Sequence, residues 1–315
     1  MTRIVYSGDV HGSEEVWLKF LASYREFKAD VIMMNGDLTG KKIVPICKMG
    51  DETWKTPFVF GKEWTLRTDD EISEFERKVR FGGMYPYRAA YEEVMELAKD
   101  RKRWEALFGD LMKEGVERWM KLLEEKVDPN VRVIVNPGND DTFMVDEAIK
   151  QCERAVYPLD KVVQLDDHHL LISCEWTNPT PWNSPREEPE GKLEKRLERV
   201  FNMVNDYENL VCNLHCPPRD SMIDMAPKLD DKRKPIMVGG NPIMIPVGSM
   251  AVRKMIEKYQ PLLGLHAHIH ESAGEAMIGR TLCLNPGSEY DTGVFRAYIL
   301  DLSPSGIENH WRVYG

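Results

Sequence analysis

The chain has 315 residues, of which 42 % are hydrophobic and 30 % are charged, an ordinary composition for a globular protein that buries a core. Its formal net charge of -10 disfavours binding to nucleic acids or anionic membranes through net charge alone. No stretch approaches the ~20 apolar residues of a membrane span. The six cysteines form no CxxC pair, and the N-terminal apolar run is too short for a signal peptide. These features predict a cytoplasmic protein.

Short apolar runs alternate with amphipathic stretches at the start of the chain. Residues 3–7 and 31–35 are expected to be strands, and the apolar residues between them, from Trp17 to Tyr24, repeat at helical spacing. This pattern predicts a βαβ unit, in which the strands are parallel and the helix covers the sheet.

The same pattern resumes after residue 130. The expected strands are "VRVIV", "HLLIS", "LVCNLH", "PLLGLH", "TLCLN" and "RAYILDL", and the expected helices cover about 145–155, 192–205 and 249–259. The last strands follow one another with few helices between them, so a mixed sheet or two packed sheets is expected.

Residues 41–130 differ from both flanking parts. Apolar residues recur there at helical spacing, for example at Ile72, Phe75 and Val79, and 18 Lys/Arg nearly balance 19 Asp/Glu. We therefore expect a core made of residues 1–40 and 131–315, with 41–130 as a helical insertion packed on it. A lid or a dimer contact is the alternative role for this insertion.

Five apolar runs end in a turn that presents Asp, His or Asn. These turns are "GDVHG" (8–12), "NGDLTG" (35–40), "PGNDD" (137–141), "NLHCPP" (213–218) and "LHAHIHES" (265–272). The ends of such strands meet at one edge of an open α/β sheet, where sites are built. Any one of these residues alone would most simply be a turn or capping residue, so the prediction of a site depends on all five stretches together.

The side chains that these turns present are carboxylates, imidazoles and an amide, without a thiolate. They are Asp9, His11, Asp37, Asn139, His215, His268 and His270. This mixture suits divalent Mn, Fe, Zn or Ni. Seven groups are too many for one ion but suit two ions that share a carboxylate and can act on both oxygens of a phosphoryl displacement.

The motifs resemble those of the calcineurin-like metallophosphoesterases, whose pattern is GDxH, GD, GNH[D/E], a lone His and GHxH. The resemblance covers both ends of the chain but not residues 41–130, and "HIHES" with "LNPGSEY" is particularly similar to small prokaryotic-type members. It implies an α/β fold, a four-layer αββα sandwich of two mixed sheets, with a dinuclear metal centre. By position it implies that one metal is bound by Asp9, His11, Asp37 and His270, and the other by Asp37, Asn139, His215 and His268, so that Asp37 bridges them.

The last motif departs from the family pattern because Ala267 stands where the family has Gly. An alternative register would make "LHAH" the motif, with His266 and His268 as ligands. The match of "HIHES" favours His268 and His270.

Asp140 is the second departure, because it stands where the family has the His of GNHD. In the family, that His is thought to stabilise the phosphoryl transition state and to protonate the leaving oxygen. An Asp, with an ordinary pKa of ~3.9, should be ionised beside two cations, so that it is a poor acid and repels phosphate. Leaving-group protonation, worth typically 10²–10⁴-fold, would then suffer.

Three consequences of this departure are open. The substrate has a good leaving group, or another acid is recruited, or catalysis has been lost. The candidate acids are His266 and the pair His168/His169, although "DHH" at 167–169 more simply marks a hairpin turn.

The long loops 178–191 and 216–248 are candidates for the substrate wall. The residues that we expect to act in catalysis are Asn139, Asp140 and His215, and those expected to contact substrate are Arg219, Trp182, Asn183 and His266.

The leading hypothesis is a phosphoesterase with two divalent metal ions, in which a hydroxide bridging the metals attacks phosphorus. An ionised Asp140 repels a singly charged diester less than a dianionic monoester, so the prediction leans towards a phosphodiester. The alternative is a metal-binding scaffold that has lost catalysis. A DNA-repair nuclease is disfavoured by the net charge, and a Ser/Thr protein phosphatase by the absence of RGNHE and of an arginine after "NGDLTGKK". The expected partner is a small phosphate ester, without nucleic acid or membrane, and a homo-oligomer is left open.

Overall fold

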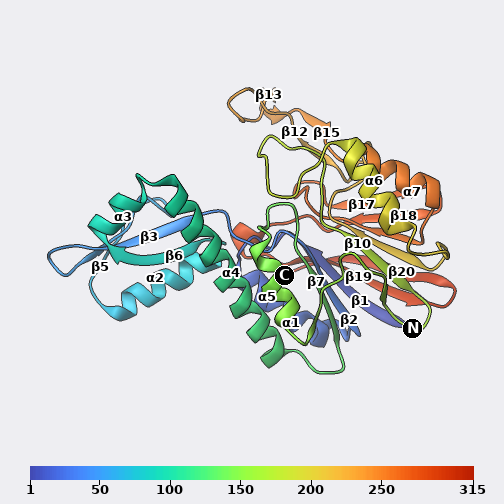
Figure 1. Cartoon of the computed structure of the whole chain (residues 1–315), viewed down its shortest axis with the longest axis horizontal. Helices are drawn as coiled ribbons and strands as arrows, with labels where there is room; N and C mark the ends of the chain where they lie inside the picture. The colour runs from blue at the N-terminus through green and yellow to red at the C-terminus, as the bar shows by residue number, and fades with distance from the viewer.

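Two six-stranded mixed sheets lie at the centre of the molecule (Figure 1). The computed structural model describes all residues from Met1 to Gly315. The first sheet has the order β20 (Gly306–Tyr314), β19 (Arg296–Ser303), β1 (Thr2–Gly8), β2 (Val31–Asn35), β7 (Arg132–Asn136) and β8 (Ala155–Val156). The second has the order β17 (Gly274–Ile278), β18 (Thr281–Asn285), β16 (Leu263–Leu265), β11 (Leu210–Leu214), β10 (Leu170–Cys174) and β9 (Val163–Gln164).

Helices cover the outer face of each sheet, which gives the four layers that the family resemblance implies. The first sheet is covered by α1 (Glu14–Phe27), α5 (Met144–Gln151) and the second half of α4 (Arg101–Lys126), and the second sheet by α6 (Glu190–Phe201) and α7 (Met250–Tyr259). Within β1, Ile4 and Tyr6 join the core between the sheets, whereas Val5 joins the core beneath the helices. Both faces of the strand are therefore buried, which explains why these strands read as continuous apolar runs.

The parallel strands end in register. Gly8 of β1 pairs with Asn35 of β2, which pairs with Asn136 of β7. In the second sheet, Asn213 of β11 pairs with Leu265 of β16. The turns that follow these strands therefore leave the sheets at a common edge.

The insertion is not only helical, and in this respect the prediction was wrong. The first part of the insertion, residues 43–97, forms a separate lobe (Figure 1, left) in which four strands, in the order β5 (Thr65–Leu66), β4 (Trp54–Lys55), β3 (Ile43–Lys48) and β6 (Tyr85–Ala90), pack with α2 (Asp69–Phe81) and α3 (Tyr91–Leu97), whereas α4 runs from the lobe onto the core. The lobe has a small hydrophobic core of its own. Its strands are short, and β3 and β6 each contain a proline, so they lack the alternation that identifies a strand in sequence.

The remaining elements are short. The loop 216–248 contains two ribbons, β12 (Met225–Pro227) with β15 (Met244–Pro246), and β13 (Met237–Val238) with β14 (Asn241–Pro242). A 3-10 turn, η1, covers Tyr290–Thr292. None of the helices combines the length and the apolar composition needed to cross a membrane.

Helix α4 connects the lobe to the core through Trp119, which stacks on Trp17 of α1 with ring centroids 4.8 Å apart. Both indoles are buried and neither N–H has a hydrogen-bond partner, so this contact depends on packing alone.

We expect Trp119→Ala to lower the free energy of unfolding by about 3–5 kcal/mol. Chemical denaturation measures this loss. Trp182→Ala, at a tryptophan that is 58 % exposed, is the control, and an equal loss in both variants would contradict the expected role of the stack.

Candidate metal centre

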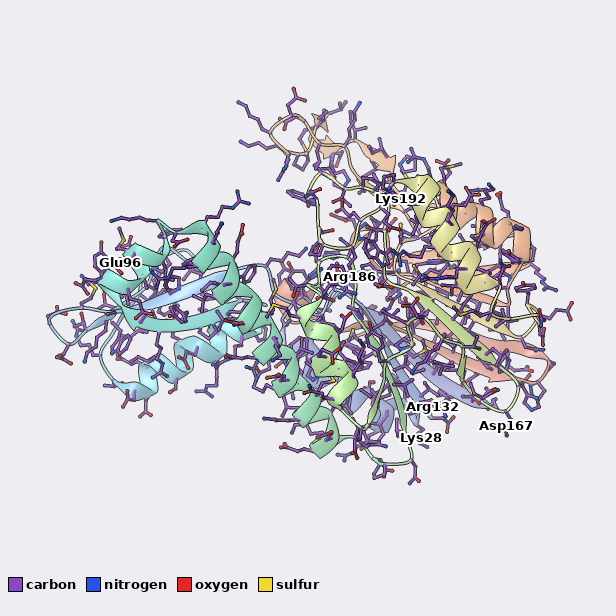
Figure 2. The ribbon with its side chains drawn as sticks, viewed as in Figure 1. Lys28, Glu96, Arg132, Asp167, Arg186 and Lys192 are labelled. Atoms are coloured by element: carbon purple, nitrogen blue, oxygen red, sulfur yellow. The ribbon has the colours of Figure 1, made fainter.

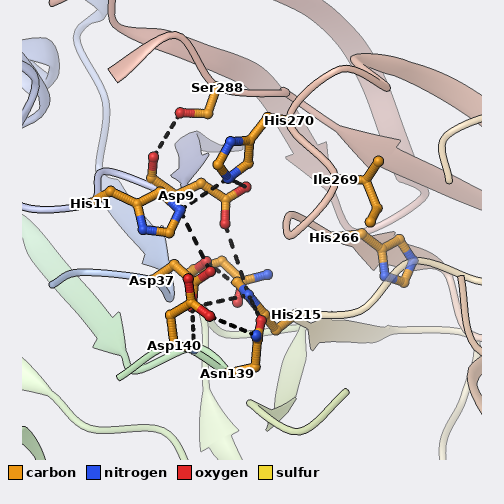
Figure 3. A network of polar contacts seen from close by, with 12 residues as sticks. Asp9, His11, Asp37, Asn139, Asp140, His215, His266, Ile269, His270 and Ser288 are labelled. Atoms are coloured by element: carbon orange, nitrogen blue, oxygen red, sulfur yellow. Dashed lines mark hydrogen bonds and ion pairs between the residues drawn. The ribbon is translucent and has the colours of Figure 1, made fainter. Parts of the chain in front are cut away.

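The side chains that the sequence predicts as metal ligands converge at the common edge of the sheets (Figure 3). Two groups without a shared residue, Asp9/His11/His270 and Asp37/His215/His268, each have their potential ligand atoms within 4.8 Å of one another. A third such group, His11, Asp37 and Asp140, overlaps with both. Asn139 joins the second group, because its Oδ1 lies 3.1 Å from His215 Nε2.

Asp37 lies between the two groups. Its Oδ1 is 3.4 Å from His215 Nε2, and its Oδ2 is 3.6 Å from His11 Nε2. On the other side of His11, the Nε2 of His270 is 2.9 Å from the Nε2 of His11. The two oxygens of one carboxylate therefore face two different imidazoles.

The backbone of the site is strained where these side chains project. Asp9, His11, Asp37 and His268 have φ values of 54°, 38°, 48° and 68°, in the left-handed region that is uncommon for residues other than glycine. The hydrogen bond from His11 N to Asp37 O, at 2.8 Å, joins the turns after β1 and β2. At Gly138, a Cβ atom would lie 2.3 Å from Asp37 Oδ1, so only glycine allows the third turn to approach the carboxylate this closely.

The three polar residues of "NDD" have different environments. Asp141 is buried and accepts hydrogen bonds from Leu38 N, from Thr39 N and Oγ1, and from Gly138 N, at 2.7–2.9 Å. It thereby holds the turn after β2 against the turn after β7. Asp140 instead forms an ion pair with Lys41, with 3.0 Å between Oδ2 and Nζ.

Two hydrogen bonds donated by Nδ2 fix the orientation of the Asn139 amide. Nδ2 donates to Ser184 Oγ at 2.6 Å and to Asp140 Oδ1 at 3.1 Å. Ser184 in turn donates its hydroxyl to Glu187 at 2.6 Å. With both amide protons directed away, Oδ1 is left facing His215.

Burial sets the protonation of most of the cluster. It lowers the pKa of His268 to about 3 and that of His270 to about 4, and it lowers the pKa of His11 well below its usual value. These three imidazoles are therefore neutral at pH 7, the form that binds metals. Burial also raises the pKa of Asp9 to about 8 in the protein without metal.

Asp37 and His215 form the charged pair of the metal-free cluster. Burial is the largest single effect and opposes both charges, but the attraction and hydrogen bond between the two groups, together with the other charges and the Asn35 carbonyl nearby, outweigh it. The pKa of Asp37 is held well below its usual value, and that of His215 is raised to about 9.

The unsatisfied atoms of the cluster indicate that it is suited to cations. Both carboxylate oxygens of Asp9 and the Nδ1 of His11 are buried without a hydrogen-bond partner, which is costly for polar groups in a protein interior. The donors are carboxylate, imidazole and amide, which suit divalent transition metals. The residues of the cluster therefore fit divalent cations.

His266 lies apart from the cluster (Figure 3). Its ring is buried, and its Nδ1 is 2.9 Å from Leu214 O and 3.0 Å from Cys216 O. The geometry thus places His268 and His270, rather than His266, beside the other ligands, in the register that the sequence favours. The turn needs no glycine at Ala267, whose φ is not positive.

The other candidate acids and substrate residues are not part of the cluster. His169 hydrogen-bonds Asp166 in the β9–β10 hairpin, and the neighbouring Asp167 lies at the far end of the molecule (Figure 2). Trp182 and Asn183 are exposed, with the Arg233 guanidinium over the Trp182 ring. Neither of them, nor the Arg219 side chain, makes a hydrogen bond or an ion pair with a cluster residue.

Sequence reasoning missed Lys41 and Ser184. Lys41 directly follows the "NGDLTG" turn, and its place there was the only signal available. Ser184 lies between Trp182 and Arg186 in a loop that is bonded to the cluster, because Arg186 N donates to Asn139 O at 3.2 Å. The loop therefore reaches the site through different residues from those predicted.

Comparisons with known proteins support the fold. A scan against protein-family models and a search of curated proteins give no match. Among solved structures, TT1561 of Thermus thermophilus has a TM-score of 0.53 at 16 % identity, and a further crystal structure has a TM-score of 0.60 at 16 % identity; both comparisons cover 100 % of this chain and 98 % of the other. The chain shares their fold. This agrees with the α/β sandwich that the resemblance to calcineurin-like metallophosphoesterases implies. A novel archaeal phosphodiesterase, at 11 % identity with 99 % of each chain covered, has a TM-score of 0.36, too low to add to this comparison.

Asp9→Asn tests whether the cluster binds metal. Because the Asp9 carboxylate has no hydrogen-bond partner, the metal-free variant should unfold at the same temperature as the wild type or higher. A metal at 100 times its Kd stabilises a protein by about 2.7 kcal/mol, and we expect the variant to lose most of the stabilisation by Mn²⁺. Thermal unfolding with and without Mn²⁺ measures both effects, and Asp167→Asn is the control. A variant with the full Mn²⁺ effect would contradict the assignment of Asp9.

Ser184→Ala tests the positioning of Asn139. Without the Ser184 hydroxyl, the amide loses its shorter hydrogen bond and can rotate its oxygen away from His215. Loss of such outer partners typically costs 10–100-fold in metal affinity, and we expect about tenfold weaker binding of the second Mn²⁺ by isothermal titration calorimetry. Ser184→Thr keeps the hydroxyl and should retain the affinity. Equal affinities in Ser184→Ala and the wild type would show that the amide is held by other contacts.

Proposed function

We propose that this protein is a metal-dependent phosphoesterase that hydrolyses a phosphate ester with two divalent metal ions. The observation that carries this proposal is the position of Asp37, whose two oxygens face His215 and His11 from separate ligand groups. A carboxylate in this position is suited to bridge two ions. The Asp9 carboxylate on the same edge has no hydrogen-bond partner, so a bound cation would stabilise it.

The residues have distinct tasks in this proposal. Asp9, His11 and His270 would hold one ion, and Asn139, His215 and His268 the other. Bound ions of the Mn, Fe, Zn or Ni type would supply Lewis acidity, which lowers the pKa of water and polarises phosphoryl oxygens. His215 Nδ1 lies 3.1 Å from Asn35 O, so a proton on Nδ1 is held by this carbonyl and Nε2 is left free to act as a ligand.

The substrate class follows from charge. In this proposal Asp9 and Asp37 bind the ions, so Asp140, which lies beside His11 and Asp37, is the carboxylate left to repel the substrate, and a singly charged diester is repelled less by it than a dianionic monoester. We therefore favour a phosphodiester over a monoester within this class. Asp140 is a poor proton donor when ionised, so esters with good leaving groups should react fastest.

The first test is hydrolysis of bis-p-nitrophenyl phosphate and p-nitrophenyl phosphate by the Mn-loaded protein. We expect turnover of both esters, a higher kcat/KM for the diester, and a loss of at least about 10³-fold in Asp37→Ala, because both ions lose a ligand. Asp110→Ala, at an exposed aspartate of α4, is the control and should retain activity. Turnover that persists in Asp37→Ala would contradict the proposal.

A metal-binding protein without catalysis is the second candidate function. The observation that favours it is Asp140, which occupies the position of a family histidine and provides no proton donor when ionised. Stoichiometric metal binding without turnover of either ester would support this candidate.

A further inference from the structure

Lys41 lies beside the candidate metal centre, where it pairs with Asp140. It follows Gly40 at the end of the turn that carries Asp37, and its Nζ lies 3.0 Å from Asp140 Oδ2. The Lys41 side chain is 49 % exposed and that of Asp140 is 23 % exposed. The ion pair is therefore open to a ligand that approaches the cluster from solvent.

Asp140 is held in place by other contacts of the cluster. Its backbone N donates to Asp37 Oδ1 at 2.9 Å, and its Oδ1 accepts from Asn139 Nδ2 at 3.1 Å. The other carboxylate oxygen, Oδ2, forms the ion pair with Lys41 Nζ. Asp140 is thus a carboxylate held by two hydrogen bonds, and its second oxygen positions the Lys41 ammonium group.

The Lys41 charge also acts on the ligands themselves. Burial is the main cause of the low pKa values of His11 and His270, and the Lys41 ammonium lowers both further. It also favours the ionised form of Asp37. These effects agree with an ammonium group that lies beside the cluster rather than on a remote surface.

We propose that Lys41 is a phosphate-binding residue, which Asp140 holds beside the cluster so that its ammonium group contacts the phosphoryl oxygens of the substrate. A lysine ammonium has three donors; Asp140 engages one, so two remain for an anion. This inference extends the proposed function, because it places the phosphate next to the metal ligands. It also gives the departure from GNHD a physical reason, since Asp140 with Lys41 together present a cationic donor that Asp140 alone would not.

The pair also bears on substrate charge. With Lys41 present, the charge of Asp140 is partly compensated, which reduces the penalty for a dianionic monoester without removing it. Without Lys41, Asp140 would face the substrate as an unpaired carboxylate. Lys41→Met should therefore reduce kcat/KM for p-nitrophenyl phosphate more than for bis-p-nitrophenyl phosphate.

The direct test is the binding of inorganic phosphate to the Mn-loaded protein by isothermal titration calorimetry. A charge-assisted hydrogen bond is worth about 1.5–3 kcal/mol, so we expect at least about tenfold weaker phosphate binding in Lys41→Met. Lys41→Arg should keep most of the affinity. Lys42→Met, at the neighbouring exposed lysine, is the matched control and should bind as the wild type does. In Lys41→Met/Asp140→Asn, removal of the unpaired carboxylate should restore part of the lost affinity.

Metal analysis of each variant distinguishes phosphate binding from a structural role. Lys41→Met should retain both Mn²⁺ ions. If it loses metal, or if it binds phosphate as tightly as the wild type, the inference is wrong; it is also wrong if the wild type binds no phosphate. If phosphate binding depends on Lys41 but neither ester is hydrolysed, the proposed function fails and the role of Lys41 stands.

Discussion

The main physical constraint on the site is that two carboxylates, Asp9 and Asp37, are buried close together at the edge of the sheets. Burial opposes ionisation of both, and the metal-free protein offers His215 as the nearby counter-charge of Asp37 while Asp9 lacks even a hydrogen bond. Such an arrangement is unfavourable unless cations occupy it. The surrounding fold must therefore be rigid enough to hold the carboxylates in place before a cation binds.

That rigidity comes from the way the strands end. Gly8, Asn35 and Asn136 lie in register across three parallel strands, so three turns begin at the same level. Asp141 ties the second turn to the third through three hydrogen bonds, and the hydrogen bond from His11 N to Asp37 O ties the first to the second. The left-handed backbone at the ligand positions is thus supported by neighbouring turns, as is typical of strain at functional sites.

The sequence predicted the core of the fold and the cluster, but not its surroundings. Strands buried on both faces give uninterrupted apolar runs, and turns with Gly–Asp or Gly–Asn mark their ends, so the strands and the convergence of Asp9, Asp37 and Asn139 could be predicted from the pattern, whereas the four-layer sandwich was implied by the family resemblance. The short strands of the lobe have neither a long apolar run nor a regular alternation of apolar and polar residues. Lys41 has a long side chain, and Ser184 lies in a loop. The direction of both side chains depends on tertiary contacts, which no local sequence pattern encodes.

The insertion, although it lies outside the recognised motifs, is part of the environment of the site. Lys41 stands between the turn that carries Asp37 and strand β3 of the lobe. Gly40 N donates to the hydroxyl of Tyr85 at the start of β6, and the backbones of Gly40 and Gly83 are so close that a Cβ on Gly40 would lie 2.2 Å from Gly83 O. The position of Lys41 is therefore set from one side by Asp140 and from the other by the lobe. The candidate ligands lie on turns that follow the strands of the sheets, whereas Lys41 lies between one of these turns and the lobe, so the packing of the lobe contributes to the position of the ammonium group.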